Sequence, residues 1–140
     1  MSYELRDHTA DVAVAANAPT LDAVFAAAAD GMAAAMCDEI PEMGGERFEF
    51  DVRAEGREAL LFDYLDELIY QRDVRGVLPV DNEAEVREER EADGEWVLEG
   101  SARGVPLADV SARDLKAVTY SEMALEETDE GWRAYVVFDV

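Results

Sequence analysis

The chain has 140 residues, 49% of them hydrophobic, and this length and apolar content predict one globular domain over residues 1–140 and exclude a disordered chain. Its 34 Asp and Glu residues outnumber its 12 Lys and Arg residues, and the formal charge of −22 disfavours direct binding of RNA or DNA. Its single cysteine, Cys37, excludes an internal disulfide and a multi-cysteine metal site. No apolar run is long enough to span a bilayer and the N-terminus has no signal-peptide layout, so we expect a cytoplasmic protein without a membrane partner.

The acidic residues are spread along the whole chain rather than gathered in a tail, and Lys116 is the only lysine. Self-repulsion among so many carboxylates destabilises a compact chain in dilute buffer. At molar salt the screening length falls to about 3 Å and this repulsion largely disappears. We therefore interpret the composition as that of a halophile, and most of the acids as a solvated surface.

The first part of the chain predicts two short strands followed by a helix. Extended segments at residues 3–6 and 12–15 flank a turn with the sequence His-Thr-Ala-Asp at residues 8–11. Thr20 is suited to the N-cap of a helix, because its hydroxyl can accept a hydrogen bond from an amide of the first turn. Apolar residues then follow helical spacing as far as Met36, before a stretch that contains proline and two glycines.

The middle of the chain predicts a half-buried strand and a second helix. Apolar and charged residues alternate over residues 47–55, which is typical of a strand with one solvated face. Apolar residues at helical spacing then predict a helix over residues 57–72. Asp63, Asp66 and Glu67 lie off its apolar stripe. In a chain this acidic, we interpret them as a solvated helix face rather than as paired carboxylates for acid–base catalysis.

The last part of the chain is predicted to be mostly strand. Turn signals join two pairs of strands, which run over residues 84–91 and 96–103 and over residues 118–127 and 132–140. Residues 105–116 are predicted to form a loop, with a short helical turn after Ser111. Helices followed by hairpins, without regular alternation of strand and helix, predict an α+β fold with two main helices and an antiparallel or mixed β-sheet.

The end of the last strand carries the first candidate site. Apolar residues on both faces of residues 132–140 indicate a central strand, so we expect Asp139 to be shielded from water and to need a partner. If the first and last strands are neighbours, Asp11 comes close to Asp139 and to the carboxylate of Val140. Two interpretations stay open on spacing alone: a hard cation bound between these carboxylates, or a capped turn beside an exposed terminus.

Two further residues stand out because each is the only one of its kind. His8 is the only histidine, and it can serve as a metal ligand, as an acid–base group or as a hydrogen-bonding residue of the turn before Asp11. Lys116 is the only lysine in a chain whose composition otherwise lacks this residue, which suggests a specific role. That role is either a salt bridge or contact with an acidic or phosphate-bearing partner. No nucleophile–base motif is visible in the sequence.

Four segments together resemble the archease family, in the same order and at the same chain length. They are His-Thr-Ala-Asp-Val at residues 8–12, Leu-Leu-Phe-Asp-Tyr-Leu-Asp-Glu-Leu-Ile-Tyr at residues 60–70, Leu-Lys-Ala-Val-Thr-Tyr at residues 115–120, and Val-Val-Phe-Asp-Val at residues 136–140. The resemblance implies strand–helix–strand–strand modules, one nested in the other. It also implies an accessory protein, not itself an enzyme, that activates the tRNA-splicing RNA ligase by promoting its guanylylation and its multiple turnover.

The resemblance also implies particular residues and a cofactor. The family binds a divalent cation, calcium in structures, through residues that correspond here to Asp11, Asp139 and Val140. It counts the residue that corresponds to Lys116 among its functional residues, and His8 becomes a neighbour of the site. Because the ligase would hold the RNA, the acidic charge of this chain is compatible with such a role.

Two other functions remain as alternatives. One is a chaperone-like modulator of tRNA-modifying enzymes, such as a tRNA methyltransferase. The other is a small metal-dependent hydrolase that uses the same carboxylates, which is disfavoured because no general base or open ligand set stands out.

Overall fold

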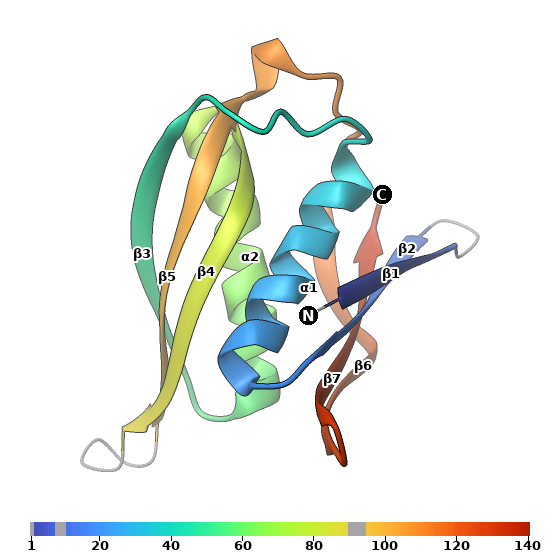
Figure 1. The fold of residues 1–140 in the computed structure, drawn as a ribbon, viewed down its shortest axis with the longest axis vertical. Coiled ribbons are helices and arrows are strands. Elements are labelled where there is room, and N and C mark those ends of the chain that lie inside the picture. The colour runs from blue at the N-terminus through green and yellow to red at the C-terminus, as the bar shows by residue number, and fades with distance from the viewer. Residues whose placement is uncertain (1, 8–10, 90–94) are drawn as a thin grey trace.

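The computed structural model describes residues 2–7, 11–89 and 95–140, and in these ranges the chain forms two α-helices, a short 3₁₀-helix and seven strands (Figure 1). The elements are β1 (Ser2–Asp7), β2 (Asp11–Ala18), α1 (Leu21–Met36), β3 (Glu46–Ala54), α2 (Arg57–Arg75), β4 (Val77–Glu89), β5 (Glu95–Pro106), the 3₁₀-helix (Leu107–Asp109), β6 (Ala117–Thr128) and β7 (Gly131–Asp139).

The strands form two sheets with the helices between them. One sheet has the order β1-β2-β7-β6, the other has the order β3-β5-β4, and every pairing is antiparallel. Both α1 and α2 contact strands of both sheets, and Figure 1 shows the three-stranded sheet and the four-stranded sheet on opposite sides of the helices. The module β3-α2-β4-β5 is inserted between α1 and β6, so the predicted α+β fold with nested strand–helix–strand–strand modules is confirmed.

Helix α1 begins where the sequence predicts it and is buried on most of its circumference. The Thr20 hydroxyl accepts a hydrogen bond from the Ala23 amide at 3.1 Å, as expected for an N-cap. A helix that lies between two sheets needs small side chains on both sides, because each sheet must approach its backbone closely. The alanines at residues 26–29 are all buried and meet this requirement.

Helix α2 extends one turn further than predicted, to Arg75, and its C-terminus is set by Gly76. Gly76 has φ of +66°, a left-handed conformation that glycine adopts without a steric cost, and its amide donates to the Arg72 carbonyl. The buried face contains the predicted apolar stripe. Tyr64 in this stripe packs against Phe25 of α1 and Phe50 of β3, with ring centroids 6.1 and 5.9 Å apart.

Arg57, the first residue of α2, lies between the two tryptophans of the chain. Its guanidinium carbon is 5.6 Å from the ring centroid of Trp96 on β5 and 5.1 Å from that of Trp132 on β7. These strands belong to different sheets. Because a guanidinium is attracted to the faces of aromatic rings, Arg57 joins the two sheets at this end of the molecule.

Some local predictions were wrong. Strands β4 and β5 are longer than predicted, with β4 beginning at Val77 and containing a register shift between Val80 and Glu83. The helical turn expected after Ser111 lies instead at Leu107–Asp109. The last strand, β7, pairs with β2, and β1 lies at the edge of the same sheet. Among the described residues, neither helix is long and apolar enough to cross a membrane.

The close approach of α1 to the four-stranded sheet gives a stability prediction. A Cβ atom added at Gly31 would lie 2.5 Å from Cγ1 of Val14 on β2. We expect Gly31→Ala to lower the free energy of unfolding, because overpacking costs about 1–3 kcal/mol and the gain in helix propensity returns only about 1 kcal/mol. Urea unfolding followed by circular dichroism in high salt measures the difference.

Gly56, the N-cap of α2, provides the matched control, because a Cβ atom there meets nothing within 4 Å. Gly56→Ser should leave stability unchanged or raise it by a few tenths of a kcal/mol. If Gly31→Ala were as stable as the wild-type protein, the tight contact between α1 and β2 would be contradicted.

Candidate functional site

The pairing of β2 with β7 brings Asp11 directly opposite Asp139, although 127 residues separate them in the chain. Directly opposite residues of an antiparallel pair project from the same face of the sheet, with Cβ atoms about 4.5–5.5 Å apart. The next residues, Val12 and Phe138, pack into the core between the sheets. Since side chains alternate along a strand, both aspartates project from the face that is turned away from the helices.

This arrangement concentrates negative charge at one end of the four-stranded sheet. Two carboxylates directly opposite each other repel, and Val140 follows Asp139 at the same end. Asp11 is half-buried, whereas Asp139 and Val140 are exposed, so the prediction that Asp139 is shielded from water was wrong. Carboxylate oxygens are the ligands that hard divalent cations take, and this donor set therefore suits such an ion.

Lys116 lies at the same end of the sheet, on the other side of β7. Its backbone amide donates to the Asp139 carbonyl at 2.8 Å, immediately before β6 begins. Its side chain is exposed. The structure therefore brings Asp11 of β2, Asp139 of β7 and Lys116, which directly precedes β6, to neighbouring positions, while the exposed amine remains available to a partner.

A buried arginine fixes the backbone that precedes Lys116. Arg72 of α2 is 8% exposed, and its guanidinium donates to the Leu115 carbonyl at 2.7 Å. The same group lies 3.4 Å from the sulfur of Met36 and donates to the Asp73 carboxylate at 2.9 Å. Because Leu115 is itself buried, the position of the Lys116 backbone is tied to the core.

A second arginine ties the same loop to the end of α1. The Arg113 amide donates to the Met36 carbonyl, and its guanidinium donates to the Ala35 carbonyl at 2.9 Å. The guanidinium also pairs with Asp38 at 2.9 Å, and this hydrogen bond and the positive charge lower the pKa of the Asp38 carboxyl. Contacts from both helices thus hold the segment that leads into Lys116.

Sequence reasoning missed Arg72 and Arg113 as positioning residues. Arg72 gave a signal, because it falls on the apolar stripe of α2, three residues after Ile69, where an exposed arginine is not expected. Arg113 gave none, since its partners are backbone carbonyls near the end of another helix.

His8 lies outside the described residues, so its role as a neighbour of the site stays a prediction. Within the described ranges, no three His, Cys, Asp or Glu side chains gather into a group that could hold a metal. The predicted metal set consists of two side chains and the carboxylate of Val140, and it also stays a prediction.

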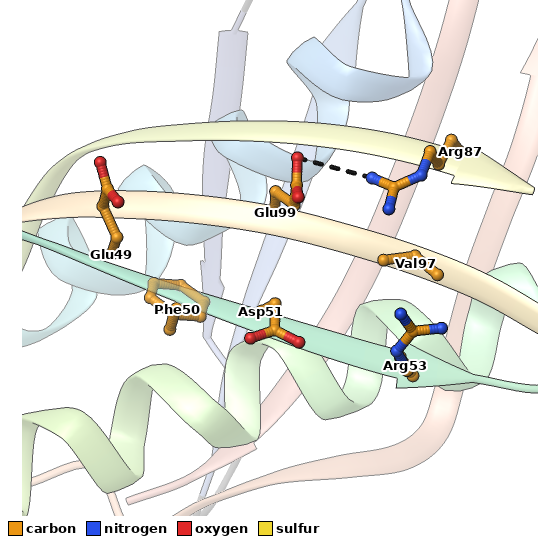
Figure 2. Close-up of a pocket in the computed structure, with 7 residues that line it drawn as sticks. All are labelled: Glu49, Phe50, Asp51, Arg53, Arg87, Val97 and Glu99. Carbon is orange, nitrogen blue, oxygen red and sulfur yellow. Dashed lines mark ion pairs between the residues drawn. The ribbon is translucent and has the colours of Figure 1, made fainter. Parts of the chain in front are cut away.

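The outer face of the three-stranded sheet carries a hollow of about 460 Å³. Figure 2 shows its charged side chains standing on neighbouring strands, with Arg87 turned toward Glu99 at 3.5 Å. The Arg87–Glu99 ion pair is solvent-exposed, and we interpret the hollow as part of a solvated charged surface. The residues that line the hollow are Glu49, Phe50, Asp51, Arg53, Arg87, Val97 and Glu99.

The two antiparallel sheets around a pair of helices define a fold that known proteins share. The solution structure of protein 1598 of Methanobacterium thermoautotrophicum matches with a TM-score of 0.77 and 28% identity, over 99% of this chain and 98% of that one. A crystal structure from Thermotoga maritima, described as an archease and possible chaperone, matches with a TM-score of 0.62 and 19% identity, over 96% and 94% of the two chains. At that identity, the second likeness shows the fold alone.

The sequence comparisons name the family. The profile of the archease protein family matches residues 3–140. The archease of Methanosarcina mazei is 36% identical over 99% of this chain and 95% of its own length, and that of Pyrococcus furiosus is 31% identical over 99% and 98%. This chain therefore belongs to the archease family, as its four motifs predicted.

The anchoring of the loop before Lys116 gives a second prediction. Arg72→Met keeps much of the buried volume but leaves the Leu115 carbonyl without its donor, which costs about 1–3 kcal/mol. We expect a lower free energy of unfolding and faster hydrogen exchange at the Lys116 amide. The measurements are urea unfolding and exchange followed by NMR.

Arg75→Met is the control, because Arg75 lies on the same helix but is exposed and hydrogen-bonds to Gln71. Its loss should cost about 1 kcal/mol or less, since only an exposed hydrogen bond to Gln71 and a contact with the Phe48 ring disappear. Equal effects of the two substitutions would argue against a special role for Arg72.

Proposed function

We propose that this chain is an accessory protein that activates the tRNA-splicing RNA ligase by promoting guanylylation of the ligase and its multiple turnover. We propose that it is not itself an enzyme. Membership of the archease family supports this assignment, together with one observation: residues from three of the four family motifs lie at one end of a sheet. The pairing of β2 with β7 places Asp11 opposite Asp139, and the backbone hydrogen bond to Asp139 places Lys116 beside them.

We propose that Asp11, Asp139 and the carboxylate of Val140 hold a divalent cation of the calcium type. Such an ion, when bound, would supply positive charge that offsets the repulsion between the facing carboxylates. The two aspartates hold their oxygens on the sheet face that is turned away from the helices, where a partner protein has access. The exposed Lys116 amine, beside them, is suited to a carboxylate or phosphate group of the partner.

The charge of the chain fits a role that acts through another protein. Binding of RNA normally needs basic contacts, and a formal charge of −22 opposes them. In the proposed division of work, the ligase holds the RNA and the nucleotide, and this chain presents its acidic end and a single lysine.

A chaperone-like modulator of tRNA-modifying enzymes, such as a tRNA methyltransferase, is the second candidate. Large apolar side chains that remain exposed on α2, among them Tyr70 and Val74, favour a protein-binding role in general. The ligase assay separates the two, because a methyltransferase partner would instead change its solubility or its choice of site when mixed with this chain.

The paired aspartates give the first functional prediction. Asp11→Asn and Asp139→Asn each remove a charged ligand while keeping the size of the side chain. We expect each to weaken calcium binding about 10-fold or more, measured by calorimetry. Each should also reduce GTP-dependent guanylylation of the purified ligase.

Asp129→Asn is the matched control, because Asp129 is exposed in the turn between β6 and β7, away from the paired aspartates. It should leave both measurements unchanged. A residue appended after Val140 should also weaken calcium binding, because it replaces the terminal carboxylate with an amide. Unchanged calcium affinity in all of these variants would refute the metal site, and no gain in guanylylated ligase from the wild-type chain would refute the function.

Lys116 allows activation to be separated from metal binding. Lys116→Met removes the charge but keeps the length of the side chain, so we expect calcium affinity within about 2-fold of wild type and a loss of ligase activation. Lys116→Arg should restore part of the activation, because it restores the positive charge. If Lys116→Met activated the ligase as well as the wild-type chain, Lys116 would have no role in partner contact.

A further inference from the structure

An aromatic ring on α2 stacks face to face with an aromatic ring on β6, a strand of the four-stranded sheet. The rings of Phe62 on α2 and Tyr120 on β6 have centroids 4.0 Å apart and planes that differ by 5°. Phe62 is half-buried, whereas Tyr120 is 56% exposed. Two turns along α2, Tyr70 is 58% exposed on the same side of the helix.

An irregularity in β6 positions Tyr120 for this stack. The pairing of β6 with β7 is regular as far as Thr119 and Val137, and it resumes at Ala124 and Tyr135. Four residues of β6 therefore lie opposite a single residue of β7, and one of them, Glu122, has φ of +59°. Residues other than glycine rarely adopt this conformation, so the bulge is held by the surrounding structure.

Two carboxylates on α2 near the stack have no cationic partner among the described residues. Asp63 and Asp66 make no hydrogen bond or ion pair within the described residues, whereas Glu67 on the same helix accepts a hydrogen bond from Gln71 at 2.6 Å. Burial, and then the Asp66 charge, raise the pKa of Asp63. Burial, and then the Asp63 charge, raise the pKa of Tyr120. Asp63 directly follows Phe62 in α2.

We propose that this α2–β6 face, formed by Phe62, Asp63, Asp66, Tyr70 and Tyr120, is a docking surface for a partner protein that inserts an arginine side chain. A guanidinium is planar, stacks on an aromatic ring and donates several hydrogen bonds to carboxylates at the same time. An exposed ring beside two unpaired carboxylates offers both kinds of contact. A lysine would make only a point-charge contact and could not stack in the same way.

The acidic side chains of the face favour a partner protein with an arginine over a nucleic acid or a second copy of this chain. The face contains no basic residue, so the phosphates of a nucleic acid would be repelled. A second copy of this chain that docked through the same face would set carboxylates against carboxylates at contact distance. An arginine of a partner protein would instead meet these carboxylates at hydrogen-bonding distance, where salt screens little. The exposed Tyr70, two turns from the stack, extends the apolar contact beyond the reach of one side chain.

The test combines two measurements, and the first does not depend on the proposed function. N-acetyl-arginine amide and N-acetyl-lysine amide are titrated into the isotope-labelled full chain in about 1 M KCl, where long-range attraction is screened. We expect the arginine compound to shift the NMR signals of residues 62–66 and 120, and the lysine compound to shift them several-fold less. These shifts should disappear in the double variant Asp63→Asn with Asp66→Asn.

The control removes two charges elsewhere. Glu49→Gln with Asp51→Asn changes two exposed acids on the outer face of the three-stranded sheet and should keep the arginine-dependent shifts. Tyr120→Ala, checked for folding by circular dichroism, should lose them because the exposed ring is gone. Equal shifts from the two compounds, or shifts that persist in the double variant, would overturn the proposal.

The second measurement rests on the proposed function and uses the tRNA-splicing RNA ligase as the partner. We expect the double variant Asp63→Asn with Asp66→Asn to bind the ligase about 10-fold more weakly while its calcium affinity stays at the wild-type value. Ligase affinity equal to wild type in this variant, with wild-type activation intact, would overturn the docking surface and leave the proposed function standing. If the wild-type chain failed to activate the ligase, the proposed function would fall, and the titration would decide the docking surface alone.

Discussion

The antiparallel pairing of β2 with β7 is the constraint on which the rest of the structure depends. It joins an early strand to the last one within the four-stranded sheet. The chain between these two strands contains an inserted module with α2 and the whole three-stranded sheet. If β7 slipped by one residue against β2, Asp139 would turn toward the core and Phe138 away from it. The hydrophobic core therefore fixes the register, and the register aligns the two carboxylates.

Arginine side chains make several of the polar connections between distant segments in the described part of this acidic chain. Arg72 binds a buried carbonyl before β6, and Arg103 joins Asp81 to the carbonyls of Pro41 and Gly44 in the loop after α1. Arg113 connects its loop to the end of α1. Each uses several donors of one guanidinium on separate acceptors, a geometry that an ammonium group cannot reproduce. The side chain of the single lysine, Lys116, is exposed and takes no part in these arginine contacts.

Local features of the fold were predictable because local chemistry determines them. The Thr20 cap, the alternation of β3 and the apolar stripe of α2 depend on neighbouring residues, and each was predicted correctly. The start of β4 was missed because Pro79 and a register shift interrupt its pattern; β4 is an edge strand, where proline is tolerated.

The site was only partly predictable, because it depends on contacts between residues that are far apart in the chain. That Asp11 and Asp139 come together could be inferred from a central last strand and from the family motifs. The exposure of Asp139 could not, because it depends on the last residues of β7 extending past the covered part of the sheet. The stack of Phe62 on Tyr120 joins two segments 58 residues apart through an irregular strand, and no sequence period signals it.

The position of Arg57 between Trp96 and Trp132 has a spectroscopic consequence. Both tryptophans of the chain lie at one joint between the two sheets, so their fluorescence reports on that joint, whereas far-ultraviolet circular dichroism reports mainly on the two helices. The two optical signals thus follow different parts of the same molecule. If the sheets separate before the helices melt, the fluorescence transition will precede the dichroism transition, and the order of events in unfolding becomes visible without any added label.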